Sequence, residues 1–193
     1  MTDWKSKAAA KRESIAASIP KEWIIPGISP QSVPRAMDFP LSEHLSPFEM
    51  EITGLNAIDL VSRIAKGQYK AVDVARAFAH RAAIAQQLTN CIMEFFWDKA
   101  EKQAKELDAY YEKYGKTVGP LHGLPISLKD QFRVEGVETC MGYIGWLGHI
   151  ETSDSVLTHI LRELGAVFYG IAPFNWVVLK DSQNNGTTKF DVR

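Results

Sequence analysis

With 193 residues, of which 46% are hydrophobic and 23% charged, the chain is long enough for one globular domain with a real core. Its formal net charge of −1 excludes the overall basic surface by which proteins attract nucleic acid or an anionic membrane. Two cysteines, Cys91 and Cys140, make no disulfide framework, so we expect free thiols in a reducing compartment. The longest uncharged run, residues 164–179, is short for a membrane span, and we expect a cytoplasmic protein.

The N-terminal part is predicted to be a helix followed by a proline-rich arm. The alanine-rich residues 3–19 favour a helix, which Pro20 stops. Six of the nine prolines fall between Pro20 and Pro47, and such a segment can be neither a central strand nor a long helix. We therefore expect an extended arm, with Trp23 and Phe39 as anchors on a larger body.

From residue 51 onward, the pattern alternates between helices and short apolar strands. Helices are predicted at about residues 56–66, 71–88, 98–111 and 154–164, and strands at residues 90–96, 124–129 and 166–170. The last helix has an apolar face that we expect to be buried, made of Leu157, Ile160, Leu161 and Leu164. This alternation indicates an α/β fold with a buried, mostly parallel sheet.

The strand "LPISLK" carries a lysine whose role is open. Side chains alternate along a strand, so Ser127 and Lys129 share one face. In a sheet covered on both sides, Lys129 would be buried, and a buried ammonium group tends to lose its proton. A neutral lysine can act as a general base near neutral pH. The alternative is an ordinary lysine that reaches solvent at the end of a strand.

The stretch "GPLHGLPISLKDQF", followed by "GVETCMGYIGW", closely resembles the lysine region of the amidase signature family, in its acetamidase-like branch. The resemblance covers roughly residues 10–169. It implies a mixed, mostly parallel sheet covered by helices, as in the N-terminal part of the amidase-signature fold, here incomplete. It also implies hydrolysis of small carboxamides to carboxylate and ammonia without a cofactor or a metal. In that family a Ser-Ser-Lys triad does the work, and Lys129 matches the lysine that acts as base. Gln131 departs from the asparagine that the family often has.

The two serines of that triad have no counterpart that we can place. In the family they lie in a glycine- and serine-rich segment downstream of the lysine, and the 64 residues after Lys129 contain no such segment. Of the serines that are present, Ser153 and Ser155 are interpreted as helix-start residues and Ser182 as a turn residue. We therefore expect a chain without activity of its own.

The family pattern also stops after Tyr169, where "GIAPFNWVVLKDSQNNGTTKFDVR" follows. This divides the chain into an N-terminal helix and arm (residues 1–50), a partial amidase core (residues 51–169) and a divergent tail (residues 170–193). A non-catalytic truncation product or interaction fragment is the alternative to an amidase.

Other candidate sites are weaker. Ser127 shares a strand face with Lys129 and could replace the missing nucleophile, but no oxyanion donor is identifiable beside it. Cys140 has no partner pattern, so a small buried or loop cysteine is the better interpretation. The five histidines lack metal-ligand spacing. As partners we expect a small amide and, through exposed core surface, a second copy of the chain, but no nucleic acid and no stable membrane insertion.

Overall fold

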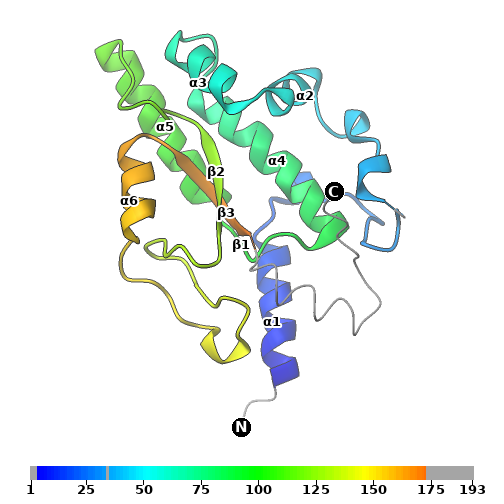
Figure 1. Cartoon of the computed structure of the whole chain (residues 1–193). Helices are drawn as coiled ribbons and strands as arrows, with labels where there is room; N and C mark the ends of the chain where they lie inside the picture. The colour runs from blue at the N-terminus through cyan, green and yellow to red at the C-terminus, as the bar shows by residue number, and fades with distance from the viewer. Residues whose placement is uncertain (1–3, 34, 173–193) are drawn as a thin grey trace.

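A small mixed sheet is the centre of the molecule (Figure 1). The structure, a computed structural model, describes residues 4–33 and 35–172. Within these residues the sheet has three strands in the order β1-β3-β2. Their bounds are β1 Glu94–Phe95, β2 Pro125–Lys129 and β3 Val167–Ala172. Strands β2 and β3 are parallel, while β1 runs antiparallel to β3. The three strands lie where the sequence predicted them, although the first predicted strand keeps only two residues in the ladder.

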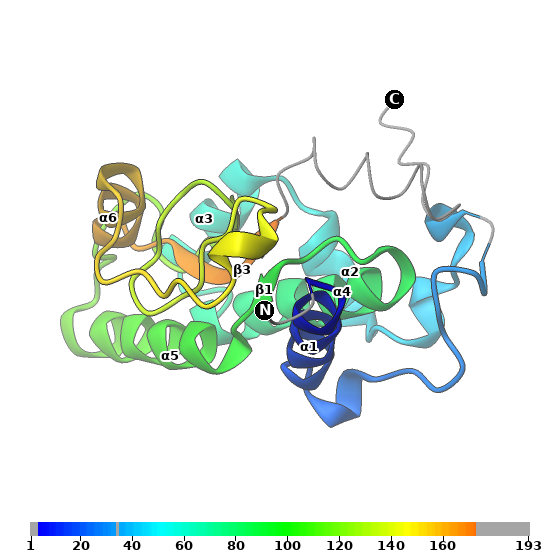
Figure 2. The same ribbon diagram turned by 90° about the horizontal axis from the view of Figure 1, so that it is seen from below.

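Helices cover the sheet and extend beyond it. Their bounds are α1 Trp4–Ala17, α2 Pro47–Gly54, α3 Ala57–Ala65, α4 Ala71–Thr89, α5 Trp97–Tyr114 and α6 Val156–Glu163, with short 3-10 turns η1 Lys21–Trp23, η2 Ala36–Asp38, η3 Leu41–Glu43 and η4 Ile144–Trp146. Figure 2 shows α5 on one side of β3 and α6, with the long loop before it, on the other. This arrangement confirms the predicted α/β class with a mixed sheet.

The core under the sheet is built largely from alanines of α4 and α5. Ala75 and Ala79 of α4 and Ala100 and Ala104 of α5 are fully buried, and they belong to one cluster with Val167 of β3. Small side chains let the two helix axes approach closely, which explains how such short apolar groups fill a core. A second cluster on the other sheet face contains Leu128, Val134, Val137, Ala166, Phe168 and Ile171.

The proline-rich arm folds back onto α4. Trp23 is 3% exposed and stacks on His80 with ring centroids 5.1 Å apart, and Phe39 is partly buried against a cluster that includes Ile84. Both predicted anchors are therefore confirmed. The prediction that the arm stays extended up to residue 50 is wrong at its end, because α2 begins at Pro47. Proline is tolerated in the first turn of a helix, where its missing N–H group needs no partner.

The predicted buried face of α6 is buried only in part. Leu161 and Leu164 are half-buried, and Leu161 packs against the cluster that contains Phe168, whereas Leu157 is 44% exposed and Ile160 is 47% exposed. Thr158, outside the predicted face, is completely buried, and its Oγ1 lies 2.8 Å from Oγ of the N-cap residue Ser155. The apolar spacing identified an amphipathic helix, but it could not tell which side the described residues cover.

The tail set apart at residues 170–193 falls outside the described residues apart from its first three. Residues 170–172 complete β3 and pair with β2. Ser182 lies in the part that the structure does not describe.

A close backbone crossing fixes how the chain enters the two parallel strands. Gly165, which ends the turn after α6, has φ +93°, a conformation that side-chain-bearing residues rarely adopt. A Cβ atom placed there would lie 2.7 Å from the Cα of His122. The Gly165 carbonyl accepts a 2.8 Å hydrogen bond from Gly123 N–H, so the two segments touch backbone to backbone just before β2 and β3.

We expect Gly165→Ala to lower the free energy of unfolding by about 2–4 kcal/mol, because it combines backbone strain with a clash against main-chain atoms. Urea denaturation followed by circular dichroism measures the loss. Gly145→Ala is the matched control, since its φ is not positive and a Cβ there meets nothing within 4 Å. Equal stability of the two variants would contradict this account of the crossing.

The start of α2 depends on one carboxylate. Glu49 accepts a hydrogen bond from the N–H group of Ser46 at 2.8 Å and donates its own N–H to Ser46 Oγ at 3.2 Å, which makes a capping box. Its other oxygen lies 2.8 Å from Nδ1 of His80 on α4. Burial opposes the charge of Glu49, but the bonds from His80 and Ser46 prevail and hold its pKa below the ordinary value of 4.5.

Because the pKa of Glu49 is lowered by folding, its contribution to stability is complete above its ordinary value and is lost as the pH falls through the lowered one. We expect Glu49→Gln to cost about 1 kcal/mol at neutral pH. The difference from the parent should shrink between about pH 5 and pH 3. Urea denaturation across that range measures it, with the exposed Glu106→Gln as control. A pH-independent difference would show that the charge of Glu49 contributes nothing.

Candidate functional site

Lys129 is the last residue of β2, at the carboxyl edge of the parallel pair. In the strand register it stands opposite Ala172, the last residue of β3. Both strands therefore end at the same edge, which is where open α/β sheets place ligands. Within the described residues Lys129 is exposed, so the alternative of a lysine at the end of a strand holds and burial in a covered sheet does not. The alternation itself holds, since Ser127 is also exposed and Leu128 between them is buried.

The backbone around Lys129 is fixed on both sides. Its carbonyl accepts hydrogen bonds from Gln131 N–H at 2.7 Å and Phe132 N–H at 3.0 Å, which form a tight turn directly after the strand. The N–H group of Asp130 donates to the carbonyl of Ala172 at 2.9 Å. The lysine is thus presented from a rigid strand end rather than from a loop, as precise placement of a reacting group requires.

Ser127 has a tyrosine, Tyr169, as its hydrogen-bonding neighbour. The side chain of Tyr169 on β3 shares a hydrogen bond with the side chain of Ser127, and burial raises the pKa of Tyr169 despite that bond. A phenol with a raised pKa stays protonated at neutral pH and cannot take the hydroxyl proton of Ser127, so this contact does not activate Ser127 as a nucleophile.

Asp130 points in the opposite direction to its exposed neighbour. Its side chain is 2% exposed, and its carboxylate accepts a hydrogen bond from Cys140 N–H at 3.2 Å. The Cys140 thiol lies 3.4 Å from the second oxygen of Asp130. Burial raises the pKa of Asp130, although the backbone N–H groups of residues 140–142 counteract it. Sequence reasoning saw Asp130 only as the residue beside the lysine.

The thiol in this contact is not a nucleophile at neutral pH. Burial, with the nearby charge of Asp130, raises the pKa of Cys140 to about 11. The interpretation of Cys140 as a buried structural cysteine is confirmed, and Cys91 is half-buried with its pKa also raised by burial.

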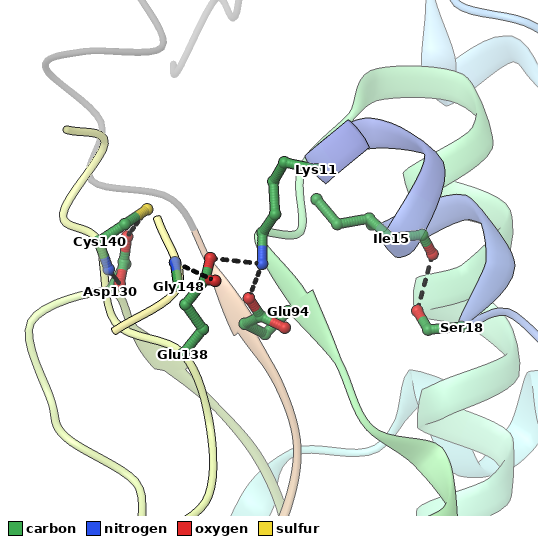
Figure 3. A network of polar contacts seen from close by, with 8 residues as sticks. All are labelled: Lys11, Ile15, Ser18, Glu94, Asp130, Glu138, Cys140 and Gly148. Carbon is green, nitrogen blue, oxygen red and sulfur yellow. Dashed lines mark hydrogen bonds and ion pairs between the residues drawn. The ribbon is translucent and has the colours of Figure 1, made fainter. Parts of the chain in front are cut away.

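An ion-pair network joins α1 to the same region (Figure 3). Lys11 pairs with Glu94 of β1 and, at 2.8 Å, with Glu138 in the loop after β2. Glu138 also accepts a 2.7 Å hydrogen bond from Gly148 N–H. Burial disfavours the charge of Lys11, but hydrogen bonds to Glu138 and Glu94 prevail and raise its pKa. No local pattern predicts this network, because both glutamates lie at least 83 residues along the chain from Lys11.

Of the two serines predicted to start a helix, one does so. Ser155 is the N-cap residue of α6, whereas Ser153 is exposed in the preceding loop. Among residues 4–33 and 35–172, no group of three or more His, Cys, Asp or Glu side chains could hold a metal ion. In the same part of the chain, no helix combines the length and apolar character needed to cross a membrane.

Comparison with known proteins gives a consistent answer. The sequence profile of the Amidase family matches residues 73–186. The chain is 54% identical over 167 residues to the acetamidase of Emericella nidulans and 52% identical over 166 residues to that of Aspergillus oryzae. Each alignment covers 86% of this chain and 30% of the relative, so the chain spans less than a third of the length of these curated relatives.

Solved structures agree with the sequence matches. A fatty acid amide hydrolase superposes with a TM-score of 0.79 at 39% identity, covering 89% of this chain and 31% of the other. The peptide amidase of Stenotrophomonas maltophilia gives a TM-score of 0.58 at 29% identity, over 65% of this chain and 26% of the other. The profile match includes Lys129 and runs 17 residues past Tyr169, beyond the point where the sequence resemblance had stopped. On these grounds the chain belongs to the Amidase family.

Proposed function

We propose that this chain carries the lysine-bearing part of an amidase that acts on small carboxamides, with Lys129 as the general base. The observation that supports it best is the position of Lys129, exposed at the carboxyl edge of β2 and β3 inside the range that matches the family. The names of the acetamidase relatives favour a small aliphatic amide as substrate.

In the proposed reaction, Lys129 takes a proton through a bridging serine from a second serine. That serine adds to the amide carbonyl and releases ammonia, and water then hydrolyses the acyl-enzyme. The 193 residues hold no glycine- and serine-rich segment to supply these serines. The second part of the proposal is therefore that this polypeptide by itself is inactive and that the serines must come from another segment.

A chimera tests the role of Lys129. Residues 10–169 replace the matching part of the Emericella nidulans acetamidase, which supplies the remainder of a working enzyme. We expect the chimera to release ammonia from acetamide, and Lys129→Ala to lower kcat by at least about 100-fold, the usual scale for a lost general base. Lys102→Ala, on the exposed face of α5, should leave the rate unchanged. Full activity of the Lys129→Ala chimera would refute the assignment.

The chain alone tests the second part of the proposal. Purified residues 1–193 should release no ammonia from acetamide or benzamide above the buffer rate. Turnover that Lys129→Ala abolishes would instead reveal a nucleophile within this chain, and Ser127→Ala would then show whether Ser127 supplies it.

We also propose that the isolated chain self-associates through the outer face of α6. Val156 is 78% exposed and stands beside the exposed Leu157 and Ile160, and contiguous apolar surface of this kind marks contact sites. Multi-angle light scattering should detect oligomers, and a hydrophobic dye should bind. Val156→Lys should weaken both signals, whereas Ile58→Lys, an equally exposed change on α3, should not. A monodisperse parent that binds no dye would count against this contact.

A further inference from the structure

The loop after β2 contains a turn in an unusual backbone conformation. Met141 has φ +49° and Gly142 has φ +78°, and Tyr143 N–H donates to the Cys140 carbonyl at 2.8 Å. Positive φ at both central residues is the signature of a type I′ turn. Such a conformation is costly for methionine, so it persists only where the surroundings determine it.

The group that holds this turn is the Asp130 carboxylate. The backbone N–H group of Cys140 donates to it at 3.2 Å, and the N–H groups of Met141 and Gly142 in the same turn help to counteract the rise that burial causes in its pKa. Successive N–H groups in a turn form a concave nest that binds anions, and here the anion is a side chain of the same protein. The carboxylate is almost completely buried, so no solvent competes for these bonds.

This turn belongs to a loop of residues 139–149, called the 139–149 lobe below, whose two ends are hydrogen-bonded to each other. Thr139 N–H donates to the His149 carbonyl at 3.1 Å, and Glu151 N–H donates to the Val137 carbonyl at 3.0 Å, so the two ends of the lobe are joined. The lobe exposes Tyr143, 61% accessible, and Trp146, 50% accessible. The lobe is joined to the end of β2 through Asp130, the residue that follows Lys129.

We propose that Asp130 is a positioning residue for the reaction, because its carboxylate holds the 139–149 lobe against the strand end that presents Lys129 and makes the lobe a wall of the amide site. This inference rests on the proposed function for its catalytic part. Its structural part stands on the contacts of Asp130 alone, and the two parts can be tested separately.

The structural part is tested on the chain of 193 residues by hydrogen exchange with NMR detection. Asp130→Asn places donors where the three N–H groups need an acceptor. We expect the amides of residues 140–142 to exchange at least tenfold faster, while the amides of the β2–β3 ladder keep their rates. Glu135→Gln removes an equal charge from an exposed residue five positions along the chain, and it should leave the exchange rates unchanged. Unchanged exchange at residues 140–142 in Asp130→Asn would overturn the proposal.

A second variant keeps the test decisive if Asp130→Asn unfolds the chain. Gly142→Ala strains the turn from its other side, where φ is +78°, and leaves the carboxylate intact. For either folded variant we expect acetylation of Lys129, followed by mass spectrometry, to speed up at least threefold relative to Lys116. If the turn amides are released and Lys129 labelling stays at the parent rate, Asp130 does not position the lysine.

The catalytic part is tested in the acetamidase chimera. Asp130→Asn should lower kcat at least tenfold with KM for acetamide changed less than threefold, and Asp130→Glu should restore part of kcat. Loss confined to KM would overturn the positioning role. An inactive parent chimera would refute the proposed function alone, because the exchange and labelling results would still decide the role of Asp130.

Discussion

The parallel pairing of β2 with β3 is the constraint on which the rest of the structure depends. Parallel neighbours need a crossover connection, and here residues 130–166 supply it with a long loop and α6. Because both strands then end at one edge, Lys129, Asp130 and the loop after them are brought together there. The glycine crossing at Gly165 and Gly123 sets the entry of both strands, and a register shift between Ile126 and Ser127 then brings Lys129 opposite Ala172.

Two adjacent residues at that edge, Lys129 and Asp130, differ completely in exposure. Lys129 is exposed, while Asp130 is buried and accepts a hydrogen bond from Cys140 N–H. A buried carboxylate is tolerable only when such donors replace its water, and the positive-φ turn supplies them. The strand end therefore buries the carboxylate and leaves the lysine exposed.

Much of the framework could be predicted from sequence because it follows from local rules. The apolar stripe of Trp97, Ala100, Ala104 and Leu107 predicts α5. Asn56 predicts the start of α3, and its Oδ1 accepts a hydrogen bond from Asp59 N–H at 2.9 Å. What could not be predicted depends on contacts between distant segments. The exposure of Lys129 and of Leu157 is decided by which elements cover them, and the buried role of Asp130 by a turn ten residues away. The density of prolines predicts no helix at residues 47–54, although Ser46 and Glu49 provide the capping pattern that starts α2.

The attachment of α1 has a consequence for the order in which the chain folds. Within α1, whose residues are all described, Ile15 is the one buried side chain, so Lys11 and its two glutamates carry much of the contact with the body. Those partners lie at residues 94 and 138, far along the chain. The helix is synthesised before these partners, yet its docking surface is complete only after the loop following β2 has been made and closed. Contacts between segments so distant in sequence form late, so α1 is made before its partners and is among the last of the described elements to settle.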